Sequence, residues 1–286
     1  MTHAPQVLDC NGRTLDLART AVMGILNVTP DSFSDGGAYA TREAALAHAR
    51  AMVEEGADII DIGGESTRPG AREVPVEEEL ERVVPVVEAC ARELPVPLSV
   101  DTSKPEVMRA AVAAGAGFIN DVRALRLPGA LETAAALKVP VCLMHMQGEP
   151  ATMQLDPRYD DVVAEVRDFL RARVEAAVAA GIPRERLVVD PGFGFGKTVE
   201  HNLTLLRGLA AFEALGCPIL AGLSRKSIIG KLRGQSVERR LHASVALALI
   251  AVANGARIVR VHDVAATVEA VRMYEAVYPR PALAAR

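Results

Sequence analysis

The chain has 286 residues, of which 50% are hydrophobic, but only 3% are aromatic and tryptophan is absent. This composition predicts an aliphatic core, excludes a disordered chain, and argues against proteins that stack single-stranded nucleic acid on aromatic side chains. The formal net charge of −4 offers no general basic field to nucleic acid or an anionic membrane, so a bound phosphate would need locally placed cations.

The N-terminal segment, before residue 20, contains the stretch VLDCNGRTLDL. Its Asn11-Gly12 pair is typical of a β-hairpin turn. The segment lacks the charged and apolar regions of a signal peptide, and the longest apolar tract, residues 245–253, is too short to span a bilayer. The four cysteines are widely spaced and form no CxxC pair, as in reduced proteins. We therefore expect a soluble, cytoplasmic protein.

From residue 21 onward, short aliphatic runs alternate with stretches of helical spacing such as 41–56, 76–94 and 159–181. The strand-like runs lie at 21–28, 57–64, 97–102, 117–121, 140–145, 186–192, 218–224 and 256–263. Apolar strands that alternate with helices indicate a parallel sheet covered on both faces, and eight such units fit one barrel of about 250 residues. The sequence predicts a single domain over residues 1–286: a (β/α)₈ TIM barrel whose bottom is closed by the N-terminal hairpin. A doubly wound sheet is the alternative, but the first strand runs into NVTPDSFSDGG rather than GxGxxG.

Every predicted strand ends in polar or glycine-rich residues. These are Asn27, the 63–69 segment, Asp101, Asn120, His145, Asp190, the 224–227 segment, and Arg260 with His262. Capping of the following helix explains any one of them. Together they favour a polar pocket, because catalytic side chains of such barrels lie at the carboxyl ends of the strands.

Two loops, residues 29–39 and 63–71, combine glycine pairs with small polar residues. Ordinary surface turns would explain the glycines. They would not explain Phe33, or Arg68 flanked by hydroxyl groups, and both features favour loops that close over an anionic substrate.

The stretch DPGFGFGKTV at 190–199 approaches a nucleotide-binding P-loop, but Pro191 stands where that motif needs glycine. We interpret Asp190 as a polar anchor and Phe193 and Phe195 as walls of a pocket for a flat ligand. A glycine-rich turn with its phenylalanines packed inward is the alternative.

The last two strands end in cations. We expect Ser224 to cap the next helix and direct backbone N–H groups toward the mouth, as an anion site requires. Lys226 is one of only five lysines, and Arg260 and His262 lie two apart on one strand face. The acidic run at 77–79 with Glu81 predicts a solvated helix face, and His145 is ambiguous, with packing in the interior as one interpretation.

The chain resembles the bacterial dihydropteroate synthases over nearly its whole length, from about residue 22 to residue 269. The similarity rests on motifs in the family's order: GILNVTPDSFSDGG, DIIDIGGESTRPGA, SVDTSKPEV, INDVRAL, VCLMHMQG, VVDPGFGFGKT, LSRKSIIG and IVRVHDV. The first two are the family's pterin-binding signatures. The resemblance implies a transferase of folate biosynthesis that joins 6-hydroxymethyl-7,8-dihydropterin diphosphate to 4-aminobenzoate, and it implies a homodimer.

The resemblance also implies residue roles. Asp101, Asn120, Asp190 and Lys226 would hydrogen-bond the pterin, Arg260 would stack on it, and Met144 and Phe195 would line its pocket. Asn27 would bind Mg²⁺, while Thr67, Arg260 and His262 would hold the diphosphate. The aminobenzoate site would be formed by the two loops (Phe33 and Asp35; Arg68 and Pro69) together with Ser227.

Three other interpretations stay open. A corrinoid-dependent methyltetrahydrofolate methyltransferase would share the pterin pocket but would not need a diphosphate clamp. A non-catalytic pterin-binding homologue would be expected to have lost loop or clamp residues. An aldolase barrel would need a Schiff-base lysine within a strand, whereas Lys226 lies just beyond one.

Overall fold

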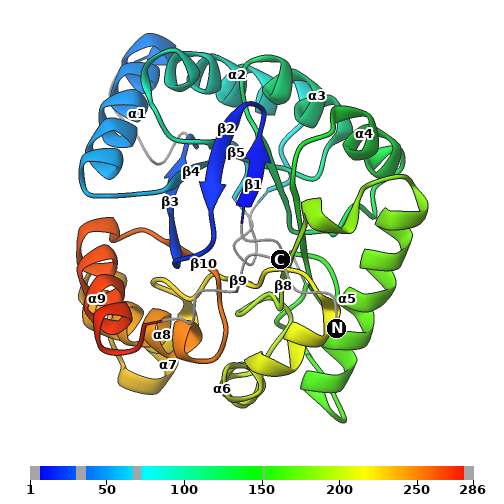
Figure 1. Ribbon diagram of the computed structural model, residues 1–286, viewed down its shortest axis with the longest axis vertical. Coiled ribbons are helices and arrows are strands. Elements are labelled where there is room, and N and C mark those ends of the chain that lie inside the picture. Colours follow the sequence, from blue (N-terminus) through cyan, green and yellow to red (C-terminus); the bar gives the residue numbers. More distant parts are fainter. Residues whose placement is uncertain (1–6, 30–36, 67–71, 151, 280–286) are drawn as a thin grey trace.

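Eight parallel strands form a nearly closed barrel in the computed structural model, which describes residues 7–29, 37–66, 72–150 and 152–279. Their hydrogen-bonded order is β8 (Leu187–Asp190), β7 (Val141–Met144), β6 (Phe118–Asp121), β5 (Leu98–Asp101), β4 (Ile59–Gly63), β3 (Ala21–Asn27), β10 (Ile258–Val261) and β9 (Leu220–Ala221). A parallel bridge between Val189 and Ile219 joins β8 to β9, where the Val189 N–H donates to the Pro218 carbonyl at 3.0 Å. Helices surround the strands (Figure 1). The predicted (β/α)₈ TIM barrel is confirmed.

Each strand lies inside the run predicted for it. The strands of the barrel are β3 (Ala21–Asn27), β4 (Ile59–Gly63), β5 (Leu98–Asp101), β6 (Phe118–Asp121), β7 (Val141–Met144), β8 (Leu187–Asp190), β9 (Leu220–Ala221) and β10 (Ile258–Val261). The helices are α1 (Gly37–Glu54), α2 (Val76–Glu93), α3 (Pro105–Ala113), α4 (Ala130–Leu137), α5 (Val162–Ala179), α6 (Val199–Arg207), α7 (Ser227–Arg233), α8 (Leu241–Ala253) and α9 (Val264–Val277). Within the described ranges, none of these helices is both long and apolar enough to cross a membrane.

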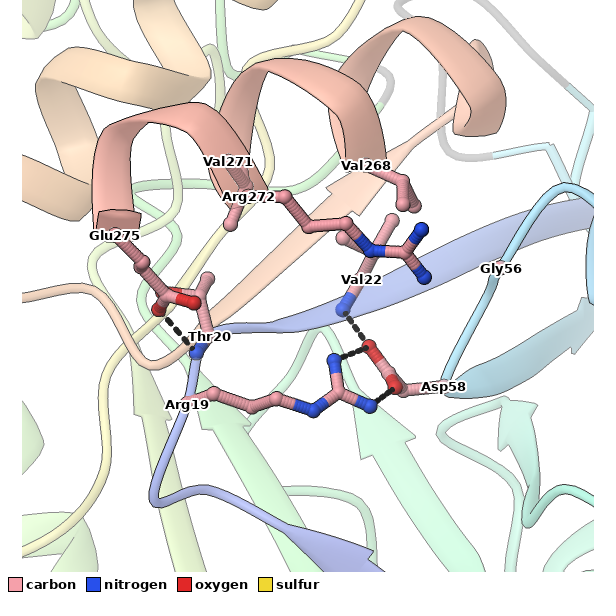
Figure 2. Close-up of a pocket in the computed structure, with 9 residues that line it drawn as sticks. All are labelled: Arg19, Thr20, Val22, Gly56, Asp58, Val268, Val271, Arg272 and Glu275. Atoms are coloured by element: carbon pink, nitrogen blue, oxygen red, sulfur yellow. Dashed lines mark hydrogen bonds and ion pairs between the residues drawn. The ribbon is translucent and has the colours of Figure 1, made fainter. Parts of the chain in front are cut away.

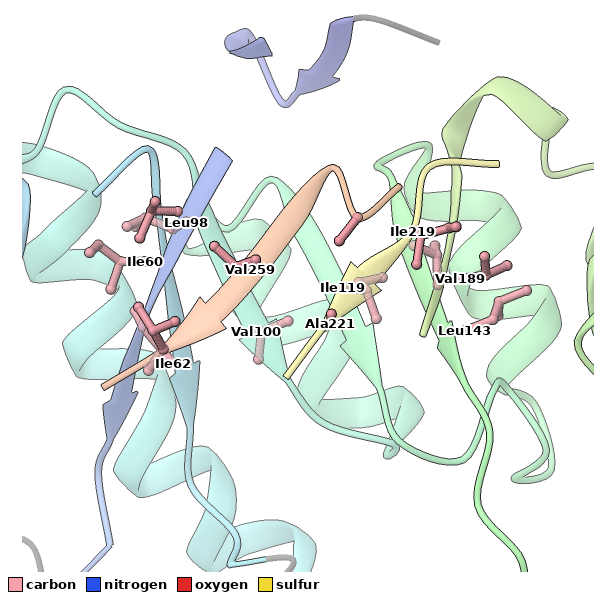
Figure 3. Close-up of a cluster of buried hydrophobic side chains, with 14 of the residues drawn as sticks. Ile60, Ile62, Leu98, Val100, Ile119, Leu143, Val189, Ile219, Ala221 and Val259 are labelled. Carbon is pink, nitrogen blue, oxygen red and sulfur yellow. The ribbon is translucent and has the colours of Figure 1, made fainter. Parts of the chain in front are cut away.

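Strand periodicity separates the core into two parts. Alternate residues such as Ile60, Ile62 and Val100 face the helices and form the larger apolar cluster (Figure 3). The residues between them point into the barrel, because successive strand side chains alternate faces. The first inward layer is apolar and includes Ile59, Phe118 and other side chains of the strand starts (Met23, Cys142, Val188, Leu220 and Ile258). The next layer, two residues further along each strand, is therefore the one that faces the mouth.

The N-terminal hairpin covers the first inward layer. Strands β1 (Val7–Cys10) and β2 (Arg13–Asp16) pair antiparallel around Asn11 and Gly12, whose φ angles are 58° and 82°. Such positive φ values at both turn residues are those of a type I′ turn. Apolar side chains of the hairpin segment (Leu8, Cys10, Leu15 and Leu17) pack on the strand starts. The predicted hairpin at the barrel bottom is confirmed.

Polar side chains fix the chain where it enters β3 (Figure 2). The Asp58 carboxylate accepts from the Val22 N–H at 2.8 Å and pairs with Arg19, and Glu275 accepts from both the N–H and the hydroxyl of Thr20 at 2.7 Å. These groups line a cavity of about 210 Å³ at the bottom of the barrel. Arg19, Asp58 and Glu275 each pair with a neighbouring group. We therefore infer that they stabilise the fold and do not bind a ligand.

The hairpin approaches the barrel so closely that position 117 admits only glycine. A Cβ on Gly117 would lie 2.1 Å from the Cys10 carbonyl oxygen, which is backbone and has no room to move aside. We expect Gly117→Ala to lower the free energy of unfolding by about 3 kcal/mol, as forced overpacking does. Gly181→Ala is the control: its φ is +95° but nothing lies within 4 Å, so only backbone strain of roughly 1–2 kcal/mol is expected. If urea unfolding shows the same loss of unfolding free energy for Gly117→Ala and Gly181→Ala, the close approach of Cys10 to position 117 does not affect stability.

Candidate active site at the barrel mouth

Arg260 joins two carboxylates at the centre of the mouth. Its Nε donates to Asp61 Oδ2 at 2.5 Å and one terminal nitrogen donates to Asp101 Oδ2 at 2.7 Å. Burial lowers the pKa of Arg260, but the two carboxylates outweigh this effect and raise the pKa above its usual value. The guanidinium is thus a permanent cation held in place from two sides.

The surroundings of Asp101 raise the pKa of its carboxyl group. Burial raises the pKa of Asp101 to about 7, and nearby Asp61 adds to the rise, while Arg260 opposes it. One guanidinium shared by two carboxylates does not fully compensate both, so burial prevails and the pKa of Asp101 stays raised. Asp101 therefore titrates close to neutral pH.

Asp61 is a site residue that the sequence reasoning missed. Its side chain is fully buried and accepts from the Ser99 hydroxyl at 2.5 Å, from Asn120 Nδ2 at 3.0 Å and from Arg260. Asp61 lies in the middle of β4 and not at its end, so the pattern of polar strand ends does not include it. A signal was present, because an aspartate inside an apolar strand is almost never buried without partners.

Asp190 and Lys226 lie on the other side of the mouth. Asp190 Oδ1 accepts from the Gly192 N–H at 2.7 Å; burial raises the pKa of this carboxyl, and Lys226 opposes the rise. Burial also lowers the pKa of Lys226 to about 8, against the pull of Asp190. The Lys226 ammonium donates to the Phe193 carbonyl and lies 4.5 Å from the centre of the Phe195 ring.

Sulfur-containing side chains form an apolar wall beside these charges. Met144 is 3% exposed, and the half-buried Phe195 packs against it together with three neighbours (Val122, Met146 and Met153). Met144 and Phe195, both predicted to line the pterin pocket, thus lie in contact. Phe193 does not join them: its side chain is fully buried in the helix-facing core, so the prediction that it walls the pocket is wrong. The inward-packing alternative holds for this residue.

The end of β9 differs from its predicted arrangement. Helix α7 begins at Ser227 with Lys226 as the N-cap residue, so Ser224 does not cap it. The Ser224 hydroxyl instead accepts from the His262 N–H at 3.1 Å and lies 3.0 Å from His262 Nδ1. The capping prediction is wrong because two further residues precede the helix. Ser224 nevertheless joins the loops after β9 and β10, which places His262 beside the Arg260 strand end.

The remaining predicted residues divide into two sets. Asn27 ends β3 beside Gly63, which in turn pairs with Asp101, so its amide lies at the mouth. The predicted loop residues Phe33, Asp35, Thr67, Arg68 and Pro69 lie outside the described residues.

Buried charges hold the stem of the second loop. Lys104 donates to Glu65 Oε2 at 2.7 Å and also to Glu79, while Glu65 Oε1 accepts from the Val74 N–H at 2.9 Å. Glu79 is fully buried, so the prediction that its acidic run forms a solvated face is wrong for this residue. Its neighbours Glu77 and Glu81 are exposed. One glutamate of an acidic run, here Glu79, can therefore be buried when a lysine of a neighbouring segment, here Lys104, pairs with it.

Comparison with known proteins agrees with this arrangement. The sequence matches the family described as pterin binding enzyme over residues 23–262. Dihydropteroate synthase of Escherichia coli K12 is 56% identical over 269 residues, covering 94% of this chain and 95% of the relative. Dihydropteroate synthase of Xanthomonas albilineans with 4-aminobenzoic acid is 60% identical, with a TM-score of 0.92 over 96% of this chain and 99% of that structure. The same enzyme in complex with 7,8-dihydropteroate has a TM-score of 0.87 at 56% identity, over 96% of this chain and 100% of that structure.

A TIM barrel with buried carboxylates, cations and an apolar wall at its mouth defines an enzyme of the pterin-binding class. The chain belongs to this pterin-binding family and, within it, to the dihydropteroate synthases, which are transferases.

Proposed function

We propose that the chain condenses 6-hydroxymethyl-7,8-dihydropterin diphosphate with 4-aminobenzoate, giving 7,8-dihydropteroate and diphosphate. The observation that carries this proposal is the pairing of Arg260 with the buried Asp61 and the half-buried Asp101, across the mouth from Asp190 and Lys226. Such a mouth offers acceptors to a flat, polar-edged ring and cations to a leaving anion. The relatives solved with 4-aminobenzoic acid and with 7,8-dihydropteroate support the same chemistry.

The pterin would lie flat across the mouth. Its amidine edge presents two N–H groups that the Asp190 carboxylate is suited to accept, with Asn120, Asp101 and Lys226 bonding the remaining polar atoms. Arg260 would stack on one face of the ring, and the Met144–Phe195 wall would cover apolar surface. Both Asp190 and Asn120 are buried, so each hydrogen bond would form with little competition from water.

Bond cleavage would precede attack by the amine. Breaking the CH₂–O bond leaves a cation delocalised into the pterin, and carboxylates Asp101 and Asp190 would stabilise that charge in the low-dielectric interior. The arylamine nitrogen then captures the carbon and loses its proton. Because this amine is already neutral at pH 7, the reaction needs no strong general base.

The leaving diphosphate needs cations at one side of the mouth. We propose Arg260, His262 and Thr67 as its ligands, with Mg²⁺ bound by Asn27. A neutral amide oxygen at a strand end fits Mg²⁺, which keeps several waters and takes other ligands from phosphate. Asn27 is half-buried, and no hydrogen bond to the described residues occupies its side chain. When bound, Mg²⁺ would neutralise charge that develops on the diphosphate.

The 4-aminobenzoate would enter from the loop side. Ser227, the first residue of α7, would bind the carboxylate by donating from its hydroxyl and backbone N–H. The loop residues Phe33, Asp35, Arg68 and Pro69 are proposed to complete this site on the resemblance alone.

Diphosphate release tests the proposed reaction. We expect the protein to release diphosphate when given the pterin diphosphate, 4-aminobenzoate and Mg²⁺, and to form a product of the mass of dihydropteroate. Omission of 4-aminobenzoate should abolish that product. Tight pterin binding without release would favour a binding protein, and methyl transfer from a methylated pterin would favour a methyltransferase.

The ionisation of Asp101 gives a pH dependence. Because its raised pKa, about 7, lies above the unfolded value of 3.8, the carboxyl is protonated at mildly acidic pH and loses the charge that would stabilise the pterin cation. We expect kcat/KM for the pterin diphosphate to fall as pH drops through about 7. The charged groups that act on Asp101 are Arg260, Asp61, Glu79 and Asp121. In Asp101→Asn, the fall of kcat/KM on the acidic side of the pH profile should disappear. A fall that persists in the variant would assign it to the substrate or another group.

We also propose a homodimer, on the strength of the resemblance. Large apolar side chains are exposed on the neighbouring helices α7 to α9 (Leu232, Ile250, Met273 and Val277). A subunit contact over these helices would cover the four side chains. Sedimentation equilibrium at micromolar concentration should give twice the 30.3 kDa chain mass, and a monomer mass would contradict the proposal.

A further inference from the structure

Lys197, the lysine of the near-miss P-loop motif, turns into the protein and not toward the mouth. Its side chain is 2% exposed. The ammonium lies 2.9 Å from His145 Nδ1, 3.0 Å from the Gly192 carbonyl oxygen and 2.9 Å from the Phe195 carbonyl oxygen. Burial lowers the pKa of Lys197, and the nearby Asp190 carboxylate opposes this effect. In its ammonium form the side chain has three N–H donors, and here three acceptors meet them. No donor is left for a substrate, so Lys197 acts on the protein itself.

A neutral His145 ring has one acceptor nitrogen, and the Lys197 ammonium beside Nδ1 favours the tautomer in which Nδ1 accepts. Burial and the adjacent Lys197 lower the pKa of His145 to about 2, so the imidazole is neutral at any working pH. The ring stands edge-on to Phe169 at 4.8 Å between centroids, and its backbone N–H donates to the Asp190 carbonyl at 2.9 Å. His145 thus connects the end of β7 to the loop after β8 through Lys197.

Other side chains bind the remaining carbonyls of this loop. Gln154 donates to the Gly194 carbonyl at 2.5 Å, and Tyr159 donates to the Gly196 carbonyl at 2.9 Å. The loop also packs against the backbone after β7: a Cβ on Gly192 would lie 1.8 Å from the His145 carbonyl oxygen. The segment 192–196 is therefore held rigidly, and among the described residues Lys197 is the one whose side chain donates to two of its carbonyls.

Three residues of the proposed pterin site depend on that segment. Asp190 accepts from the Gly192 N–H, Phe195 contributes its ring to the apolar wall, and Lys226 donates to the Phe193 carbonyl while lying over the Phe195 ring. A shift of the Gly192 or Phe195 peptide would move all three together. A displacement of side chains that together bind one ligand weakens the binding strongly.

We propose that Lys197, supported by His145, is a positioning residue for the pterin half of the site. It fixes the 192–196 segment and thereby sets the positions of Asp190, Phe195 and Lys226. This inference rests on the proposed function and adds a residue that touches neither substrate. The lysine of this glycine-rich segment, which ends in Gly-Lys-Thr, thus holds its own loop.

Steady-state kinetics separate positioning from general stability. For Lys197→Met we expect KM for the pterin diphosphate to rise about tenfold or more, because bonds from a charged donor are lost, while KM for 4-aminobenzoate stays within about twofold. A merely structural role would lower the active fraction, and so kcat, without changing either KM. Lys138→Met, at an exposed lysine between the end of α4 and the start of β7, is the control and should match the wild type.

A matched pair at position 145 covers the case in which Lys197→Met does not fold. Asparagine places an oxygen where histidine has Nδ1, so His145→Asn should keep the acceptor and a pterin KM near that of the wild type. His145→Leu removes the acceptor and should raise the same KM. Equal pterin KM values for both variants would overturn the proposed support.

Hydrogen exchange tests the inference independently of turnover. The amides of residues 192–195 should exchange at least about tenfold faster in Lys197→Met, with protection elsewhere in the barrel unchanged. Unchanged protection of these amides would overturn the role of Lys197 even if the enzyme is active. Absence of diphosphate release by the wild type would overturn the proposed function alone, and the exchange result would still decide the inference.

Discussion

Replacement of Arg260 by alanine is expected to lower kcat/KM for the pterin diphosphate by about 10²-fold or more, as removal of a group that stabilises transition-state charge does. The guanidinium would serve two purposes at once, since it would cover the pterin face and offset charge on the departing diphosphate. Its removal would also leave Asp61 and Asp101 as buried, unpaired carboxylates. Initial rates of diphosphate release at limiting pterin diphosphate measure the loss.

Two further variants make that result specific. Arg260→Lys keeps a charge but loses the planar fork that spans both carboxylates, so it should remain well below wild-type activity. Arg257→Ala removes an arginine just before the start of the same strand, at the opposite end from the mouth, and should leave turnover unchanged. Near wild-type turnover of Arg260→Ala would contradict the role given to Arg260.

Replacement of Asp190 by asparagine should reduce kcat/KM for the pterin diphosphate by about 10²- to 10³-fold. The amide oxygen of asparagine could still accept from the Gly192 N–H, so the loop should keep its geometry. The amide would, however, offer the amidine edge of the pterin one acceptor in place of two, and it would carry no charge toward the pterin cation. The loss should therefore come from chemistry and recognition, with the loop intact.

The control for Asp190 is an aspartate of the outer surface. Asp168 lies on α5 with its side chain 57% exposed, and Asp168→Asn should leave both KM values and kcat unchanged. Calorimetric titration with the pterin substrate should show weaker binding to Asp190→Asn, and its thermal unfolding should resemble that of the wild type. An Asp190→Asn enzyme within about threefold of wild-type kcat/KM would rule out the proposed anchor.

The sequence predicted the barrel well because apolar periodicity is dictated by the fold itself. Each strand of a parallel barrel is buried on both faces, so a run such as 140–145 is apolar whatever the function. The strand-end search found Asp101, Asn120, Asp190 and Arg260 for a related reason. In this fold, polar groups at strand ends meet at one mouth.

The parts that sequence could not supply depend on which way a side chain turns. Glu79 lies in an acidic run but meets Lys104 in the interior, and nothing in its local pattern distinguishes it from Glu77. Phe193 and Phe195 stand two apart in one loop, yet one enters the core and the other the mouth. Positive φ angles at Gly192 and Gly194 turn this loop, so alternation along it carries no information.

Asp61 shows a different limit. Function was expected at strand ends, whereas Asp61 lies in the middle of β4 and accepts hydrogen bonds from Asn120 and Arg260. Only the register of β4 against its neighbours shows that these side chains converge. A residue such as Asp61 is recognised from its side-chain contacts in the folded structure, because the spacing of such residues along the chain follows no common pattern.

The location of the pterin is the central claim, and a crystal structure of the protein with 6-hydroxymethyl-7,8-dihydropterin diphosphate and Mg²⁺ tests it most directly. We expect the ring between the Arg260 guanidinium and the Met144–Phe195 wall, with its amidine edge on Asp190 and its diphosphate beside His262. A ring bound elsewhere, or a ring in the mouth whose edge makes no contact with Asp190, would contradict the account.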